Sequence, residues 1–232
     1  MSIAENLERV RGEIGDACVR AGRAVGDVAL MAVSKVHPVE ALVEAHAAGQ
    51  RLFGENRVQE WQQKAVVAGT LPGIEMHLIG PLQSNKTAKA AELFWGVDTV
   101  DSLRIAARLN EAAKALGKRL PVFVEVKLSP EETKHGLQPG ELPGLLDAVA
   151  GMDALVLSGL MTVPPWPADV ANAGQEARPY FRELRRLRDE AVARHPTVTG
   201  LSMGMSNDFA VAIEEGSTCV RIGTAIFGKR VL

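Results

Sequence analysis

Two hydrophobic patterns alternate along the chain, one typical of helices and the other of buried strands. Over residues 3–21, apolar side chains recur every three or four positions, which predicts an amphipathic helix, and Ser2 and Glu5 have the spacing of a capping box at its start. Residues 28–33 are almost wholly apolar, as expected for a parallel strand covered on both faces. Similar runs recur, each followed by a helical stretch except the last. The predicted strands span residues 28–33, 51–53, 75–79, 96–100, 121–126, 154–157, 198–201 and 218–222.

This alternation predicts a single (β/α)8 barrel of the TIM type, because a doubly wound open sheet usually has only about five or six strands. After the last predicted strand, residues 224–232 are too few for a full eighth helix. We therefore expect the helix at 3–21 to occupy the eighth outer position. No linker or internal repeat interrupts the pattern, so residues 1–232 are expected to form one domain.

Composition and charge narrow the classes of function. The chain has 26 basic and 28 acidic residues, a net charge of −2, which is too balanced for a protein that coats nucleic acid. No apolar run is long enough to cross a bilayer, and the start lacks a secretory signal pattern. Cys18 and Cys219 are far apart, and no zinc or HExxH spacing occurs. We expect a cytoplasmic protein without a metal, a membrane partner or a nucleic-acid partner, and with both cysteines reduced and buried.

Polar residues follow several predicted strands directly. Active sites of (β/α)8 barrels lie at the C-terminal ends of the strands, so these residues should converge on one mouth. Lys35 follows the first strand, Asn56 follows the second, and His77 lies in the third. A lysine at the end of a buried strand is desolvated, which makes the amine nucleophilic and suited to Schiff-base chemistry. The alternative is that Lys35 extends into solvent or pairs with Glu55.

The loops after the seventh and eighth strands have the features of a phosphate site. Ser206 or Asn207 can cap a short helix over 208–215, and a helix N-terminus offers free N–H groups to an anion. Gly223 permits close approach to the backbone, and Thr224 adds a hydroxyl and an N–H donor. Many barrels bind phosphate with these two loops. The alternative is an ordinary helix cap beside a tight turn.

Arg221 is expected to face the barrel interior, on the same side as Gly223, because side chains alternate along a strand. A charged arginine inside a barrel is costly unless it meets a partner. That partner can be a phosphate, a structural carboxylate or a ring nitrogen of a cofactor.

Six blocks of the sequence together resemble the pyridoxal phosphate homeostasis protein family. They are AVSK at 32–35, FGENRVQE at 53–60, HLIGPLQSNK at 77–86, GLM at 159–161, LSMGMS at 201–206 and RIGTAIFG at 221–228. The resemblance implies a barrel similar to the N-terminal domain of alanine racemase, with pyridoxal 5'-phosphate (PLP) joined as a Schiff base to Lys35. It also implies that PLP contacts the side chains or backbone of Asn56, Ser206, Arg221, Gly223 and Thr224. Of these, Ser206, Gly223 and Thr224 match phosphate-holding positions, and Arg221 matches the arginine that faces the pyridine nitrogen.

The resemblance further implies a protein of intracellular PLP homeostasis that buffers, carries or delivers the cofactor, without turnover of its own and with indirect effects on amino-acid and keto-acid metabolism. An arginine at the pyridine nitrogen keeps the ring unprotonated, which makes PLP a weak electron sink. Racemases of the related fold also take a tyrosine from a second domain of the partner subunit, whereas the only tyrosine here, Tyr180, lies in a predicted helix. The first alternative is a PLP-dependent racemase that uses Lys35 as one base and His77 or another pocket residue as the other. The second is a phosphate-binding barrel lyase whose Lys35 forms a Schiff base with a sugar phosphate.

Two further expectations concern partners. Apo PLP-dependent enzymes are the expected recipients of the cofactor, and a monomer is expected because no clearly exposed apolar helix is evident.

Lys134 lies in the loop after the fifth strand, where it can offer PLP a second attachment site during transfer. The alternative for Lys134 is an ordinary solvated loop lysine.

Overall fold

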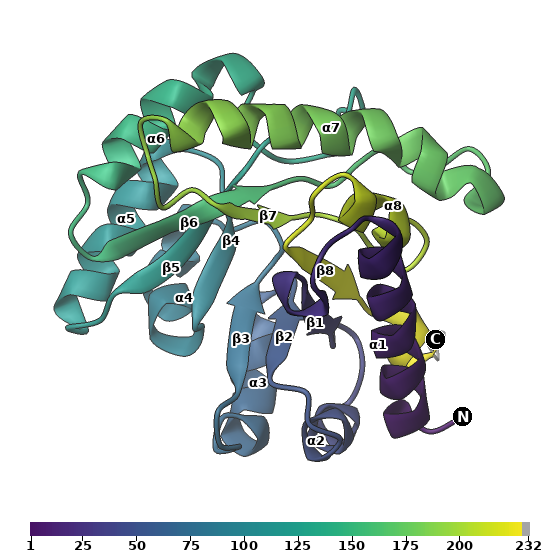
Figure 1. Ribbon diagram of the computed structural model, residues 1–232. Helices are drawn as coiled ribbons and strands as arrows, with labels where there is room; N and C mark the ends of the chain where they lie inside the picture. The colour runs from purple at the N-terminus through teal and green to yellow at the C-terminus, as the bar shows by residue number, and fades with distance from the viewer. Residues whose placement is uncertain (229–232) are drawn as a thin grey trace.

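Eight parallel strands close into a barrel in the computed structural model, which describes residues 1–228 (Figure 1). The strands pair in sequence order, and β8 pairs with β1 to complete the barrel. The strands are β1 (Ala29–Val33), β2 (Leu52–Glu55), β3 (Glu75–Leu78), β4 (Gly96–Val100), β5 (Leu120–Glu125), β6 (Leu155–Met161), β7 (Gly200–Ser202) and β8 (Cys219–Ile222). The predicted barrel is therefore confirmed, while the last four residues of the predicted domain, 229–232, lie outside the described residues.

Helices surround the barrel, and the first of them occupies the position that the last strand leaves open. They are α1 (Ile3–Arg20), α2 (Val39–Ala47), α3 (Val58–Ala68), α4 (Thr87–Leu93), α5 (Leu103–Ala115), α6 (Leu142–Ala150), α7 (Ala173–Val192), α8 (Phe209–Glu214) and α9 (Thr224–Phe227). Helix α1 contacts α2, α8 and α9 and so fills the eighth outer position, as predicted (Figure 1). Ser2 and Glu5 form the expected capping box at its start. Within residues 1–228, no helix is both long and apolar enough to cross a membrane.

Several strand boundaries differ from the predicted ones because pairing continues past the end of an apolar run. The sixth strand, predicted to end at residue 157, extends to Met161, which pairs with Glu125 of β5. The second strand continues to Glu55, which pairs with Leu78. Backbone hydrogen bonds between strands do not require apolar side chains, so glycine and buried polar residues can extend these strands.

The helix caps are partly as predicted. The Ser102 hydroxyl accepts a hydrogen bond from the Ile105 N–H at 3.4 Å and caps α5. The prediction that Ser206 or Asn207 caps the helix over 208–215 is wrong, because α8 begins at Phe209 and Asp208 is its N-cap. The Asp208 carboxylate accepts the Met205 N–H at 2.5 Å and closes the preceding turn. The helix therefore begins only at Phe209.

The barrel interior is filled by large side chains that pack against glycines of neighbouring strands. The ring of Phe123 on β5 lies against Gly159 on β6 and Gly200 on β7, and a Cβ atom at either glycine would come within 2.6 Å of it. Cys18 and Cys219 are buried and free, as predicted. The interior is thus a packed core below the mouth, as in other small barrels.

Gly159→Ala is expected to lower the free energy of unfolding by about 3 kcal/mol, because the added methyl group overpacks the barrel. Its Cβ would lie 2.2 Å from the Gly200 carbonyl oxygen, so a strand would have to move. Urea unfolding followed by circular dichroism measures the loss. Gly144→Ala is the control: this α6 glycine has no atom near its Cβ position, and alanine should stabilise the helix by about 0.5–1 kcal/mol. Equal stability of both variants would contradict the close strand contact.

Candidate functional site

Lys35 lies in a tight turn directly after β1, at the C-terminal end of the barrel strands. The preceding residue, Ser34, is tied to β2 because its N–H donates to the Gly54 carbonyl at 3.1 Å. The turn is closed by the His37 N–H, which donates to the Ser34 carbonyl at 3.2 Å. The Lys35 side chain is half-buried. The sequence prediction of a lysine at the end of the first strand is confirmed in position.

Strands β2 and β8 flank β1 and bring two other predicted site residues to the same edge. On one side, Val33 pairs with Gly54, so Asn56 and Lys35, each two residues further along, end neighbouring strands. On the other side, a Cβ atom at Gly223 would lie 3.2 Å from the Val33 carbonyl oxygen. Lys35 therefore sits between the end of β2 and the end of β8.

The loop after β7 reaches the same edge. The Arg221 N–H of β8 donates to the Gly204 carbonyl at 2.9 Å, which places the turn containing Ser206 beside the end of β8. Ser206 is half-buried, and Thr224 is exposed at the first position of α9. Four neighbouring strands, β7, β8, β1 and β2, thus bring the predicted site residues together at one side of the mouth.

Arg221 is buried in the barrel, with 4% of its surface exposed. Its Nη1 donates to the Ser202 hydroxyl at 2.8 Å, and its Nη2 donates to the Thr162 carbonyl at 2.8 Å. The Ser202 hydroxyl in turn donates to Asp98 Oδ2 at 3.2 Å. Of the partners considered for this arginine, the structure places a carboxylate one hydrogen bond away, behind a serine.

His77 completes this chain of polar groups across the interior. Its Nδ1 lies 2.7 Å from Asp98 Oδ1. Burial lowers the pKa of His77, but the charge of Asp98 and its hydrogen bond outweigh burial and raise the pKa above its ordinary value. A continuous path therefore runs from His77 through Asp98 and Ser202 to Arg221, with a cation favoured at each end.

Glu125, which sequence reasoning missed, is a buried carboxyl group at the end of β5. Only 5% of its surface is exposed, and its Oε2 has no hydrogen-bond partner within residues 1–228. Burial raises the pKa of Glu125 to about 7, against the opposing positive charge of Arg221. Its position two residues after Phe123 was the available signal, because alternation turns both side chains inward.

Lys64, also missed, is a buried lysine on α3. Its surface is 9% exposed, and its Nζ donates to Glu55 Oε1 at 2.7 Å. Glu55 is fully buried between the barrel and the helices, and burial raises its pKa even though Lys64 and Ser34 bond to it. The available signal was helical spacing, since Lys64 lies three residues after Trp61 and four before Ala68, both buried.

Lys134 lies in the loop after β5, as predicted. Its Nζ is 3.8 Å from Glu131 Oε2, and its positive charge acts on Glu125. Glu131 Oε1 also accepts the Trp166 N–H at 2.8 Å, which joins this loop to the one after β6. Lys134 is half-buried rather than fully solvated.

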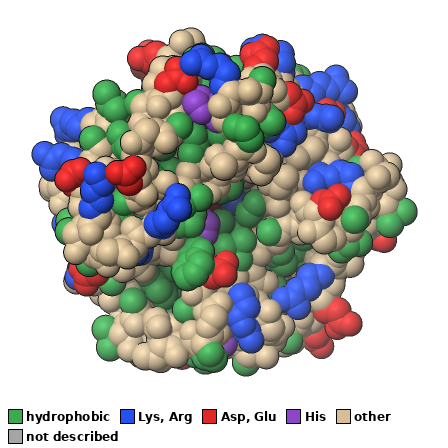
Figure 2. All heavy atoms as spheres, turned by 60° about the vertical axis from the view of Figure 1, so that its left-hand side comes forward, with side chains coloured by type: hydrophobic (Ala, Val, Ile, Leu, Met, Phe, Trp, Pro, Cys, Tyr) green, Lys and Arg blue, Asp and Glu red, His purple; other side chains and the backbone are tan. Residues whose placement is uncertain are grey.

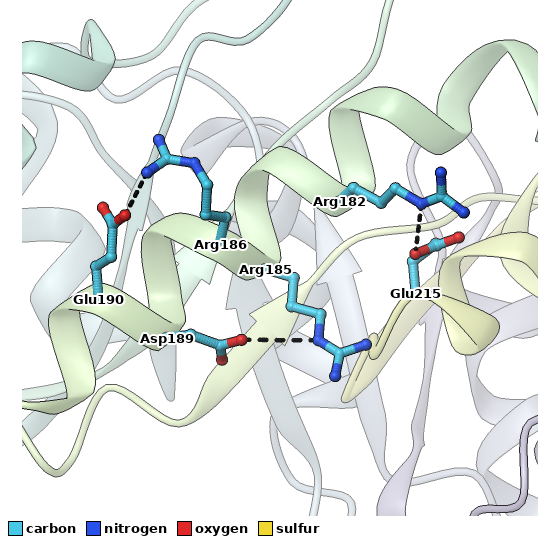
Figure 3. A pocket seen from close by; sticks show the side chains of 6 residues that line it. All are labelled: Arg182, Arg185, Arg186, Asp189, Glu190 and Glu215. Carbon is cyan, nitrogen blue, oxygen red and sulfur yellow. Dashed lines mark hydrogen bonds and ion pairs between the residues drawn. The ribbon is translucent and has the colours of Figure 1, made fainter.

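The arginines of α7 form ion pairs on the outer surface of the molecule. Figure 3 shows Arg182 paired with Glu215, Arg185 facing Asp189, and Arg186 paired with Glu190. On the face drawn in Figure 2, basic and acidic side chains are interspersed. The pocket beside α7 is lined by Arg182, Arg185, Arg186, Asp189, Glu190 and Glu215, so its formal charge is balanced. Such mixed charge is typical of a solvated helix face.

Comparisons with known proteins place this geometry in a family. The family model described as alanine racemase, N-terminal domain, matches residues 4–231. The pyridoxal phosphate homeostasis protein of Vibrio cholerae is 44% identical over 99% of this chain and 97% of its own length. That of Pseudomonas aeruginosa is 45% identical over 99% of this chain and 96% of its own.

Solved structures agree with these matches. The PipY protein of Synechococcus elongatus, solved with PLP bound, is 38% identical and superposes with a TM-score of 0.86 over 98% of this chain and all of its own. An alanine racemase of Clostridium difficile shares the fold, with a TM-score of 0.72 at 16% identity, and this chain covers 57% of it. The chain belongs to the pyridoxal phosphate homeostasis protein family, whose barrel is that of the alanine racemase N-terminal domain.

Proposed function

We propose that this protein binds PLP at the mouth of its barrel, with the cofactor joined to Lys35 as a Schiff base, and that it serves intracellular PLP homeostasis. In this proposal residues 1–232 act as one cytoplasmic PLP-binding domain that buffers, carries or delivers the cofactor. The observation that carries the proposal is the meeting of Lys35 with the glycine-containing end of β8 and the turn after β7. Its support from relatives is that they are named for PLP homeostasis and that one is solved with PLP bound.

The residues at the mouth fit a phosphorylated aldehyde. Gly223 leaves the backbone open beside Val33, and the first turn of α9 has N–H groups without partners inside the helix. The hydroxyl groups of Ser206 and Thr224 add donors for the phosphate. Asn56 adds an amide next to Lys35 at the end of β2. Arg221 supplies a fixed positive charge for the pyridine end.

The same residues favour binding over turnover. PLP supplies an electron sink for amino-acid chemistry, and that sink is strong only when the pyridine nitrogen is protonated. Arg221 is held by Ser202 and Thr162, so a positive charge stays where it opposes this protonation. We therefore propose a protein without its own catalytic cycle, whose partners are apo PLP-dependent enzymes and which acts as a monomer.

The first test is covalent loading. The protein mixed with PLP should turn yellow, and borohydride reduction should leave a pyridoxyl phosphate group on the peptide that contains Lys35. Lys35→Ala should give neither result, whereas Lys134→Ala, a matched lysine in a loop at the same end of the barrel, should keep both. A colourless wild-type protein, or a label on another lysine, would refute the proposed site.

A second measurement separates a carrier from a racemase. Amino acids are incubated with the loaded protein in deuterated water, and exchange of the α-proton is followed by mass spectrometry. We expect exchange no faster than with free PLP. Faster exchange that disappears in His77→Gln would instead identify a PLP enzyme with His77 as a base.

A further inference from the structure

The turn that carries Lys35 contains a backbone conformation that its sequence does not favour. Val36 has φ 61°, and within residues 1–228 it is the one residue other than glycine with a positive φ. Left-handed backbone is unfavourable for a β-branched residue, and turn positions with positive φ are usually occupied by glycine. The Val36 side chain is 59% exposed, so core packing does not hold it in place. Contacts of the backbone must therefore stabilise this turn.

The first of these contacts comes from α3. The Val36 N–H donates to Glu60 Oε1 at 2.5 Å, and Lys64 Nζ donates to the same oxygen at 2.8 Å. Burial raises the pKa of Glu60, but the bonds from Lys64 and Val36, with the positive charges nearby, outweigh it and lower the pKa below its ordinary value. Glu60 is thus a carboxylate at neutral pH, and its bond to Val36 is charge-assisted.

The second contact acts on the other side of Lys35. Lys64 Nζ donates to the Ser34 carbonyl at 2.9 Å and to Glu55 Oε1 at 2.7 Å. Glu55 Oε1 also accepts the Ser34 hydroxyl at 2.7 Å. An ammonium group has three protons, and the three acceptors around Lys64 use all of them. One buried ammonium therefore fixes Ser34 directly and Val36 through Glu60.

We infer that Glu60 and Lys64 are positioning residues that aim the Lys35 side chain into the barrel mouth. They hold the backbone immediately before and after Lys35, from a helix outside the barrel, and have no contact with the cofactor in the proposed site. If the turn relaxes to negative φ at Val36, the peptide groups around Lys35 rotate and its amine leaves the reacting position. This inference rests on the proposed role of Lys35 in binding PLP.

The test measures PLP loading in variants of Glu60. Glu60→Ala removes the acceptor for Val36 and should slow growth of the yellow chromophore, and weaken PLP binding, by about tenfold or more. Glu60→Gln keeps an oxygen acceptor for the Val36 N–H, so its loss should stay within about threefold. Lys64→Met, a second variant should Glu60→Ala fold poorly, should slow loading similarly. Circular dichroism and urea unfolding of the PLP-free proteins check each fold.

A glycine rescue distinguishes positioning from a general loss of structure. Glycine adopts positive φ without a steric penalty, so Val36→Gly in the Glu60→Ala background should return loading to within about threefold of wild type. A defect in α3 packing would not respond to glycine at residue 36. Glu92→Ala is the matched control, because it removes an exposed helical ion pair with Lys89 and should load normally.

Two results would overturn the inference while leaving the proposed function intact. In one, wild type loads PLP and Glu60→Ala loads equally fast. In the other, Glu60→Ala loads slowly and the added glycine has no effect. A wild-type protein that takes up no PLP would instead refute the proposed function, and the inference with it.

Discussion

Arg221→Met is expected to lower the free energy of unfolding of the PLP-free protein by about 3–5 kcal/mol, because removing one member of a buried charged network leaves the other charges uncompensated. Arg221 is bonded to Ser202 and Thr162, and Asp98, only 1% exposed, lies one hydrogen bond beyond Ser202. Methionine has similar length but supplies no donor. Urea unfolding at neutral pH measures the loss.

The control for this prediction is an arginine on the outer surface. Arg182→Met removes an ion pair with Glu215, but the Arg182 side chain is 65% exposed. Exposed pairs contribute about 0–1 kcal/mol, so this variant should change stability little. Equal losses of unfolding free energy in the two variants would mean that the buried network of Arg221, Ser202 and Asp98 does not need the charge of Arg221 for its stability.

Glu125→Gln is expected to stabilise the PLP-free protein at about pH 8 by about 3 kcal/mol and to have little effect at about pH 4. Burial raises the pKa of Glu125 from 4.5 to about 7, so the folded protein binds this proton more tightly than the unfolded chain does. Wild-type stability is therefore fully present below about pH 4.5 and falls as the pH rises to about 7. Glutamine does not titrate and avoids that loss.

The groups around Glu125 set the size of this effect. Arg221 and Lys134 lower its pKa, while Asp98 and Asp101 raise it. The unfolding free energies of wild type and Glu125→Gln should diverge as the pH rises from about 4.5 to about 7. Glu132→Gln, in the exposed part of the loop after β5, is the control. A difference that is constant with pH would show that the Glu125 carboxyl does not change its protonation on unfolding.

The barrel and the place of the candidate site were predictable from the sequence because both depend on local periodicity. Apolar strands that alternate with amphipathic helices bury their apolar surface by forming a parallel barrel covered by the helices. The C-terminal ends of all the strands then lie at the same mouth. Lys35, Asn56 and Gly223 can therefore be assigned to one edge from their positions directly after apolar runs. The sequence also predicted that α1 takes the eighth outer position, where it contacts α2, α8 and α9.

Features that depend on tertiary partners were not predictable in the same way. Ser206, Asn207 and Asp208 are all good cap residues in adjacent positions, and the bond from Met205 to Asp208 decides among them. A lysine in a helix is usually solvated, and Lys64 is buried because Glu55, nine residues earlier, ends a strand beneath it. Strand lengths likewise depend on neighbouring strands rather than on the apolar run alone.

The closure of the barrel between its first and last strands has a consequence for how the protein is made. Asn6 of α1 donates to the Ile226 carbonyl at 2.9 Å, and β1 pairs with β8, so this seam joins parts of the chain about two hundred residues apart. Lys35 and Gly223 lie on opposite sides of the seam. During translation, Gly223 must leave the ribosome before it can meet Lys35. Nascent chains should therefore acquire the cofactor only after synthesis of the barrel is complete.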